Sequence, residues 1–154
     1  MSEHRTKLNW NRATPDFDYK TYNRSHTVTF KNGQPLEMSA SVAYKGDASM
    51  VDPEEAFVAA LSSCHMLSFL AIASGKKFVV DSYEDDAIGH LEKNAEGQFA
   101  VTRVTLHPQV KFGGNGPDAA THRQMHDKAH HACFIANSVK TDVTVEVGEP
   151  AGIV

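Results

Sequence analysis

Two short β-leaning segments are the first regular features in the pattern of apolar and polar positions. They are residues 27–30 and 36–42, and they lie on either side of Asn32-Gly33. This dipeptide suits the positive φ angles of a tight hairpin turn. The N-terminal part of the chain is therefore expected to form a small three-stranded meander.

A long helix is predicted to begin at Pro53. Asp52 can act as the N-cap, Pro53 takes the first helical position, and Glu55 supplies the acid three residues after the cap. Acidic side chains in this first turn also face the positive end of the helix. The apolar run that follows stops near Gly75. At about 22 residues, this helix would be roughly 33 Å long.

Two β-rich arms follow the helix, at residues 78–91 and 99–112, and the turn residues 94–97 join them. We expect the arms to form a long hairpin. Pro117-Asp118 then begins a second, more polar helix that ends around Cys133.

The last regular segment is residues 141–147, where polar side chains alternate with valine as in a half-buried strand. The predicted order of elements is βββ-α-ββ-α-β. Strands and helices occur in separate runs, which is typical of the α+β class. The 154 residues fit one compact domain, and we predict a single domain over residues 1–154.

Charge and composition narrow the possible partners. The 15 Lys and Arg are scattered and the 19 Asp and Glu outnumber them, so nucleic acid is not expected as a partner. No stretch approaches the roughly 20 apolar residues that span a bilayer, and no membrane partner is expected. The polar start of the chain contains no signal-peptide core. A soluble cytoplasmic protein is the resulting expectation.

Cys64 lies in the middle of the predicted long helix, among small residues that let another backbone or a small substrate approach closely. Free cysteine is among the most buried residue types, so an inert core thiol is one interpretation. One side of the helix is expected to be packed. That side carries Phe57, Leu61, Cys64, Ser68 and Ile72.

Cys133, at the end of the second helix, makes a redox interpretation of Cys64 stronger. A thiolate that is oxidised by a peroxide becomes a sulfenic acid, which escapes further oxidation if a second thiol condenses with it. In a reducing compartment, two cysteines are redox-active, metal-binding or inert more often than permanently bridged. Cysteines on two helices can supply both thiols, but the sequence alone does not show that they meet.

Four segments of the sequence together resemble the OsmC/Ohr family. They are residues 53–55 (Pro-Glu-Glu), 59–66 (Ala-Ala-Leu-Ser-Ser-Cys-His-Met), 101–104 (Val-Thr-Arg-Val) and 129–139 (Ala-His-His-Ala-Cys-Phe-Ile-Ala-Asn-Ser-Val). The similarity covers nearly the whole chain after residue 20. It implies an OsmC-like fold and an intertwined homodimer, with long central cysteine-bearing helices flanked by sheets.

The resemblance also implies an activity, namely the thiol-dependent reduction of organic hydroperoxides to alcohols. Cys64 matches the peroxidatic cysteine, Cys133 the resolving cysteine, and Glu54 the carboxylate that positions an arginine beside the thiolate. Arg24 matches that arginine, with Arg12 as the alternative. A dithiol reductant, of lipoyl type or a small thiol, is implied as the partner that restores the thiols. Neither a cofactor nor a metal is implied.

The role of the arginine also follows from chemistry. A free cysteine has a pKa of ~8.5, so a nearby guanidinium raises the reactive thiolate fraction. Glu54 and Cys64 are roughly 15 Å apart along one straight helix. Two antiparallel copies would bring Glu54 of one chain toward Cys64 of the other. We therefore predict that each active site is shared across a two-fold interface.

Histidines recur on one face of the second helix, at His122, His126 and His130. With Asp127 and Cys133 nearby, this spacing could seat a metal. We prefer the interpretation of a polar, solvated helix face, because no glutamate completes a metalloprotease motif.

His65 directly follows Cys64, but adjacent helical positions point about 100° apart. It is therefore not an obvious base for the thiol.

Three function classes remain open on the sequence: a dithiol peroxidase, which we prefer, a small-molecule-binding protein on the same scaffold, and a metal-dependent hydrolase. The sequence does not choose between the OsmC and Ohr branches, or among alkyl, aryl and fatty-acid hydroperoxides. Candidates for an apolar lining that would favour organic peroxides are Met50, Phe57, Met66, Phe69 and Phe134.

Overall fold

The computed structural model describes residues 1–148 and has two α-helices and eight strands in this part of the chain. This mixed composition confirms the predicted α+β class. The chain divides into two compact units, Met1–Ala56 and a second unit that begins at Phe57. The assignment of one domain to the whole chain stays a prediction.

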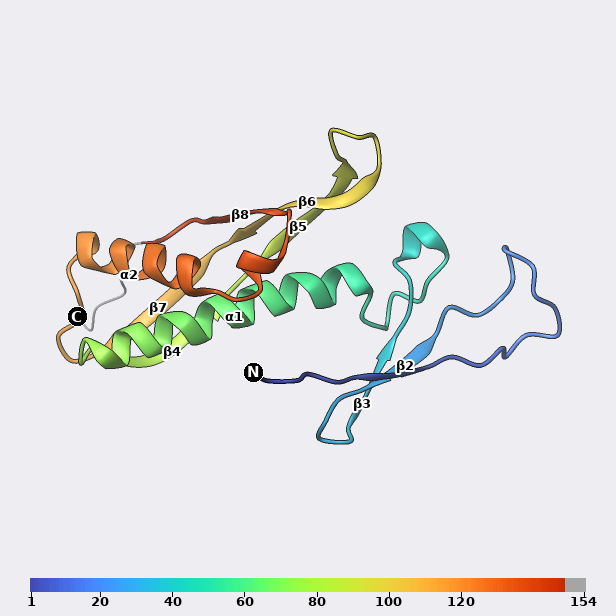
Figure 1. Ribbon diagram of the computed structural model, residues 1–154, viewed down its shortest axis with the longest axis horizontal. Helices are drawn as coiled ribbons and strands as arrows, with labels where there is room; N and C mark the ends of the chain where they lie inside the picture. Colours follow the sequence, from blue (N-terminus) through green and yellow to red (C-terminus); the bar gives the residue numbers. More distant parts are fainter. Residues whose placement is uncertain (149–154) are drawn as a thin grey trace. The chain divides into compact units, whose positions relative to one another are not determined.

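The first unit is a three-stranded antiparallel sheet, drawn in blue and cyan in Figure 1. Its strands are β1 (Lys7–Asn9), β2 (His26–Thr29) and β3 (Pro35–Met38), with β2 in the middle. The predicted meander is confirmed. The third strand is shorter than expected, because it ends at Met38 and the chain then forms the 3₁₀ turn Val42–Tyr44.

The hairpin loop around Asn32-Gly33 differs from the predicted tight turn. Gly33 has a φ of +79°, but Asn32 is not in the left-handed region. The Gly33 N–H donates to the carbonyl of Phe30 at 2.9 Å, which closes a turn in which only the last residue needs a positive φ. The turn at residues 94–97 repeats this arrangement, with Gly97 at +79° and its N–H donating to Asn94.

Helix α1 (Pro53–Gly75) has the predicted bounds and the predicted cap. The Glu55 N–H donates to the Asp52 carboxylate at 2.8 Å, and the Asp52 N–H donates to the Glu55 carboxylate at 3.0 Å. These reciprocal bonds form a capping box, which satisfies N–H groups that a helix start leaves without partners.

The second unit contains most of α1 and the remaining elements of the chain. They are β4 (Val79–Asp85), β5 (Ile88–Lys93), β6 (Phe99–Leu106), β7 (Pro108–Gly113), α2 (Ala119–Ala132), the 3₁₀ turn Ala136–Ser138 and β8 (Asp142–Val145). Strands β5 and β6 pair antiparallel, and β8 adds to β6 in parallel. Strands β4 and β7 form a separate two-stranded sheet.

The predicted long hairpin is therefore confirmed in its pairing but is divided into two sheets. Each arm is interrupted, at Asp86-Ala87 on one side and at His107 on the other. The Asp85 carboxylate accepts a hydrogen bond from the His107 N–H at 2.7 Å, which ties the two interruptions together. The chain can change sheets here because a side chain satisfies the backbone donor that the ladder leaves free.

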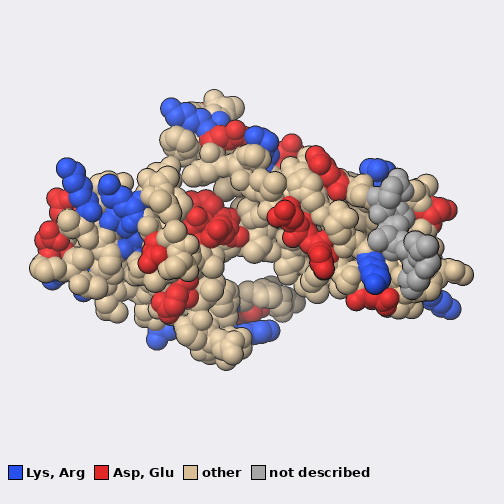
Figure 2. Space-filling view, turned by 180° about the vertical axis from the view of Figure 1, so that it is seen from behind, with Lys and Arg blue, Asp and Glu red and all other residues tan. Residues whose placement is uncertain are grey.

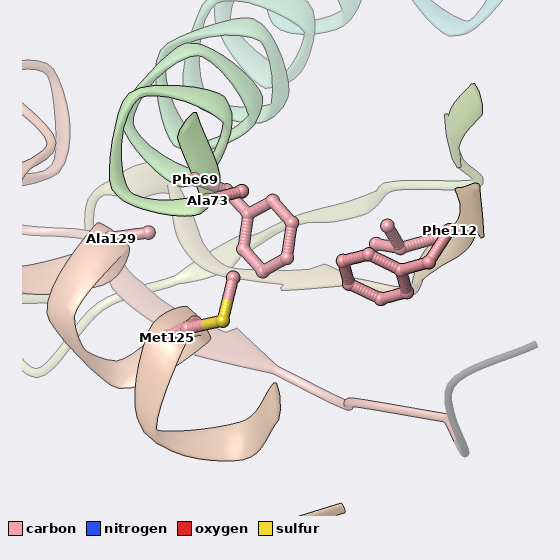
Figure 3. Packing of buried hydrophobic residues seen from close by; sticks show 6 residues of the cluster. Phe69, Ala73, Phe112, Met125 and Ala129 are labelled. Atoms are coloured by element: carbon pink, nitrogen blue, oxygen red, sulfur yellow. The ribbon is translucent and has the colours of Figure 1, made fainter. Parts of the chain in front are cut away.

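Two hydrophobic clusters hold the second unit together, one toward each end of α1. Phe69 and Ala73 of α1 pack with Phe112 of β7 and with Met125 and Ala129 of α2. Figure 3 shows the side chains of α1 and α2 facing each other across this cluster.

The other cluster joins Leu61, nearer the start of α1, to Val104 and Leu106 of β6. Cys64 and His65 lie on α1 between these two clusters.

The packed face of α1 differs from the predicted one. Its buried residues are Leu61, His65, Phe69 and Ala73, which follow one another at intervals of four. Cys64 and Ser68 are half-buried at the edge of this stripe. The predicted side included Cys64 because small and apolar residues were treated alike. It did not include His65, which the core accommodates.

Helix α1 is also more apolar than predicted, because its 23 residues pass a test of length and composition for crossing a bilayer. Core helices pass the same test, so the property is weak evidence for a membrane span. Figure 2 shows acidic and basic side chains interspersed on one face of the described chain. That face carries no continuous basic stripe of the kind that a nucleic-acid backbone requires.

The first cluster gives a direct stability prediction. Replacing the fully buried Phe112 by alanine should lower the free energy of unfolding by about 3–5 kcal/mol, because the cavity cannot close completely. Phe99→Ala is the matched control, since Phe99 is 63% exposed, and it should change stability by less than about 0.5 kcal/mol. Urea denaturation measures both. Equal losses in the two variants would contradict the assignment of the core.

Candidate functional site

The two cysteines, far apart in the sequence, meet in the second unit. Cys64 lies in the middle of α1, and Cys133 is the C-cap of α2. Both are free thiols, and the thiols are hydrogen-bonded to each other. Cys64 is partly exposed, whereas Cys133 is only 1% exposed. A reagent from solvent can therefore reach Cys64 more readily than Cys133.

The surroundings of Cys133 keep it protonated beside Cys64. Burial and the hydrogen bond to Cys64 raise the pKa of Cys133 above its usual value. The interaction with Cys64 thus favours the protonated form of Cys133. The N–H of Ala136 donates to the Cys133 sulfur at 3.4 Å and partly opposes the rise.

Local interactions fix the segments that carry the two thiols. The Ser62 hydroxyl, two residues before Cys64, donates to the Asp85 carboxylate at 2.5 Å and attaches α1 to the end of β4. Helix α2 begins at the N-cap Asp118, which accepts from the Thr121 N–H at 2.7 Å. It ends at Cys133, whose backbone N–H donates to the carbonyl of His130. The predicted start and end of this helix are confirmed.

A chain of three buried imidazoles lies between α1 and α2. His65 Nε2 and His126 Nδ1 share a hydrogen bond of 3.0 Å, and His126 Nε2 and His122 Nε2 share one of 3.2 Å. Each of the three side chains is at most 1% exposed. The prediction of a solvated histidine face is therefore wrong for His122 and His126. They share the core-facing side of α2 with Met125 and Ala129.

Burial makes two of these imidazoles hard to protonate. It lowers the pKa of His65 from its usual 6.5 to about 4, and the nearby His130 adds to this shift. It lowers the pKa of His126 to about 3, with smaller contributions from His122, His65 and Arg123. The Asp85 carboxylate opposes the shift of His65 but does not cancel it. His65 and His126 are consequently neutral at pH 7.

The histidines do not assemble into a metal site in the described part of the chain. No group of three or more His, Cys, Asp or Glu is arranged there to hold an ion. His126 uses one nitrogen toward His65 and the other toward His122, so the three rings do not point at a common centre. Asp127 is exposed, on the other side of α2.

Arg24 lies in the first unit, within a loop rich in aromatic residues. Its guanidinium donates to the carbonyls of Tyr22 and Tyr19 at 2.5 Å each. It also lies over the ring of Tyr22, 3.8 Å from the centroid. Such stacking favours arginine over lysine. The loop carbonyls and the ring hold the guanidinium in one orientation.

A cavity of about 380 Å³ adjoins Arg24 within the same unit. It is lined by Trp10, Phe17, Tyr22, Arg24, His26, Ser39, Ala40 and Pro53. Aromatic walls with one cationic and few polar groups suit a small apolar molecule that carries one polar end. The residues proposed earlier as an apolar lining do not line this cavity. Among them, Phe69 is a core residue and Phe134 is 81% exposed.

The other two predicted site residues of the first unit, Glu54 and Arg12, form neither a hydrogen bond nor an ion pair with Arg24 in the described structure. Glu54 is half-buried in the first turn of α1. Arg12, the alternative arginine, is exposed and donates to the carbonyls of Thr14 and Pro15. The roles of Arg24, Arg12 and Glu54 stay predictions.

Residues 46–148 match a protein family described as OsmC-like protein, and this match includes both cysteines and all three buried histidines. The chain belongs to the OsmC/Ohr family. An OsmC-like protein of unknown function from Vibrio cholerae has the same fold, with a TM-score of 0.92 and 46% sequence identity over 96% of this chain and 100% of that one.

Two more distant structures with the same fold carry functional names. An organic hydroperoxide resistance protein OsmC from Legionella pneumophila is 18% identical, with a TM-score of 0.72, and the match covers 98% of each chain. The organic hydroperoxide resistance protein OhrB of Bacillus subtilis is 16% identical, with a TM-score of 0.65, over 96% of this chain and 98% of that one. At such identities the similarity shows the fold alone. No curated protein matches the sequence.

The imidazole chain of this OsmC-like protein is not among the features predicted from the sequence. A signal was present, because His122, Met125, His126 and Ala129 share one side of the predicted second helix. Histidines that alternate with apolar residues on a packing face are buried with them. His65 is four residues after Leu61 and therefore on the same side of α1, although its direction differs from that of Cys64.

The buried imidazoles predict an acid-sensitive stability. His65 and His126 stay neutral in the folded protein and titrate near 6.5 in the unfolded chain, so unfolding takes up protons between pH 6.5 and about 4. Above pH 6.5, the two imidazoles are neutral in both states and do not lower the free energy of unfolding. Below pH 6.5, the free energy of unfolding should fall by up to about 1.4 kcal/mol per pH unit for each imidazole.

Urea denaturation at several pH values between 7 and 5 measures this dependence, and His126→Phe should show a shallower one than the parent. The exposed His131 provides the control, because His131→Phe should keep the parental slope. Identical slopes in the parent and in His126→Phe would show that the imidazole of His126 is not buried in the neutral form.

Proposed function

We propose that this OsmC-like protein is a thiol-dependent peroxidase that reduces organic hydroperoxides to alcohols. The observation that carries the proposal is the contact between the partly exposed Cys64 thiol and the buried Cys133 thiol. One thiol is accessible to a substrate, and the other is beside it but shielded. That arrangement suits an attacking and a resolving cysteine.

The reaction would proceed in two displacements at sulfur. The Cys64 thiolate attacks the outer oxygen of the hydroperoxide, the O–O bond breaks, and the alkoxide leaves as the alcohol after taking up a proton. Cys64 is then a sulfenic acid. The Cys133 sulfur attacks the Cys64 sulfur, hydroxide leaves with the proton from Cys133 as water, and the Cys64–Cys133 disulfide forms. A dithiol reductant, of lipoyl type or a small thiol, restores both thiols.

Arg24 and Glu54 would complete the site. A guanidinium close to the thiolate favours the reactive form of Cys64 and stabilises the charge that builds on the leaving alkoxide. The fixed orientation of the Arg24 guanidinium supports this role. Glu54 is almost three helical turns, roughly 15 Å, from Cys64 along α1. We therefore propose a homodimer in which Glu54 of one chain serves the site of the other.

The proposed homodimer is supported by the surface of α1. Ala59, Ala60 and Ala71 are exposed, and Leu67 is 60% exposed, on the side of the helix away from the buried stripe. An apolar helix that leaves one side uncovered is expected to pack against another element. A cytoplasmic location, where thiol reductants are abundant, is part of the same proposal.

A binding protein for a small apolar molecule is the second candidate, because the cavity beside Arg24 would serve such a ligand equally well. The two candidates differ in what happens to the thiols. A binding protein has no need of two hydrogen-bonded cysteines, and its ligand should leave both unchanged. A peroxidase should consume hydroperoxide in proportion to the dithiol reductant that is supplied.

The cysteine variants test the proposed reaction. With dithiothreitol as reductant, Cys64→Ser should abolish the consumption of cumene hydroperoxide, because it removes the attacking sulfur. Cys133→Ser should still react once and then accumulate sulfenic and sulfinic acid at Cys64, which mass spectrometry detects. If Cys64→Ser retains the parental rate, Cys64 is not the attacking residue and the proposal fails.

The arginine variants test the assignment of Arg24 against Arg12. Arg24→Gln should lower the rate constant for the reaction with cumene hydroperoxide by about 100-fold, the usual cost of removing one group that stabilises developing charge. Arg12→Gln is the matched control and should react at the parental rate. Stopped-flow measurement of Cys64 oxidation gives both constants. A loss confined to Arg12→Gln would transfer the role to Arg12.

A further inference from the structure

The imidazole chain His65–His126–His122 lies between the two helices that carry the cysteines. His65 is the neighbour of Cys64 on α1, and His126 lies on α2 about two helical turns before Cys133. We propose that this chain is a positioning device that holds Cys133 within bonding reach of Cys64. The inference rests on the proposed function, since it concerns the step that closes the Cys64–Cys133 disulfide.

The hydrogen bonds of the imidazole chain fix the orientation of the rings that they join. A neutral imidazole has one N–H and one acceptor nitrogen. His126 uses both nitrogens, so it donates in one bond and accepts in the other. A small rotation of α2 would break the bond to His65 and leave a polar nitrogen unsatisfied in the core, which is costly. The chain therefore resists sliding of α2 along α1.

Ring packing reinforces the same contact. The rings of His65 and His126 are nearly parallel, at 5°. His126 also stacks on Phe69, which follows His65 by one helical turn, at 4.2 Å and 24°. His126 thus contacts two successive turns of α1, one by a hydrogen bond and one by an aromatic face. This is a more restrictive contact than an aliphatic side chain of the same volume would make.

Disulfide chemistry makes this restriction useful. A disulfide forms without strain only over a narrow range of Cα separations, about 4.4–6.8 Å. Displacement by about 1 Å from a productive geometry can slow a reaction by roughly 100-fold. The imidazole chain and the thiol contact join the same two helices, so a change in the first is transmitted to the second.

Three titratable or charged groups surround the neutral rings of His65 and His126. His130 and Asp85 act on His65, and Arg123 acts on His126. His65 Nδ1 has no hydrogen-bond partner among the described residues, so the chain ends there. Its function is accounted for by the His65–His126 hydrogen bond between α1 and α2, which the His126–His122 bond within α2 supports, without transfer of a proton to the thiols.

A glutathione redox buffer tests the positioning role without any peroxide. In such a buffer two protein thiols reduce one glutathione disulfide to two glutathiones and form the Cys64–Cys133 disulfide. The equilibrium constant measures how well Cys133 is presented to Cys64. His126→Phe keeps the ring and its stacking but removes both hydrogen bonds. We expect the constant to fall by about tenfold or more.

His131→Phe is the matched control, because His131 is exposed on the same helix and belongs to no part of the chain. It should leave the constant at the parental value. His65→Phe breaks the same hydrogen bond from the α1 side and should repeat the effect of His126→Phe. Circular dichroism identifies which variants are folded under the conditions of the titration.

If His126→Phe or His65→Phe is folded and has the same equilibrium constant as the parental protein, the proposal is wrong. Loss of the fold in both His126→Phe and His65→Phe would overturn it too, since the chain would then be required for folding and not for positioning. The outcome is separate from that of the peroxidase proposal. If the equilibrium constant changes in the histidine variants but the parental protein consumes no hydroperoxide, the positioning role stands and the peroxidase proposal fails. If the constant is unchanged and the protein is fully active, the peroxidase proposal stands and the positioning role fails.

Discussion

The packing of α1 against α2 and the β4–β7 sheet is the constraint on which the rest of the second unit depends. Phe69 is fully buried and contacts β4, β7 and both core histidines of α2 through its ring. This cluster fixes the distance between the helices, and each helix carries one cysteine close to it. The proximity of Cys64 and Cys133 is thus a consequence of core packing, not of their own interaction, which is a single weak thiol hydrogen bond.

The same packing makes the two thiols unequal. Cys64 lies at the edge of the buried stripe of α1, whereas Cys133 caps the end of α2 and is itself buried. Burial raises the pKa of Cys133, and the interaction with Cys64 adds to the rise. Chemical asymmetry therefore arises from position alone. The buried imidazoles also depend on their position. They form hydrogen bonds with one another instead of with water, and these bonds are directional contacts inside an apolar core.

Local signals in the sequence were sufficient for most of the fold. The capping residues Asp52 and Glu55 located the start of α1, and the alternation at residues 141–147 located β8. The division of the long hairpin into two sheets depends on a contact between Asp85 and His107, which no local pattern reveals. The meeting of Cys64 and Cys133 is likewise a tertiary property. Family resemblance pointed to it, whereas burial of His122 and His126 was missed because histidine was treated as polar.

The most direct test of the account is the number of free thiols in reduced protein before and after one equivalent of cumene hydroperoxide, with peptide mass spectrometry of the product. If Cys64 attacks the peroxide and Cys133 resolves the product, both thiols are lost and a peptide pair linked through Cys64 and Cys133 appears, together with one equivalent of the alcohol. Two thiols that remain intact would contradict this mechanism, and would leave an OsmC-like scaffold in which the paired cysteines serve only the core.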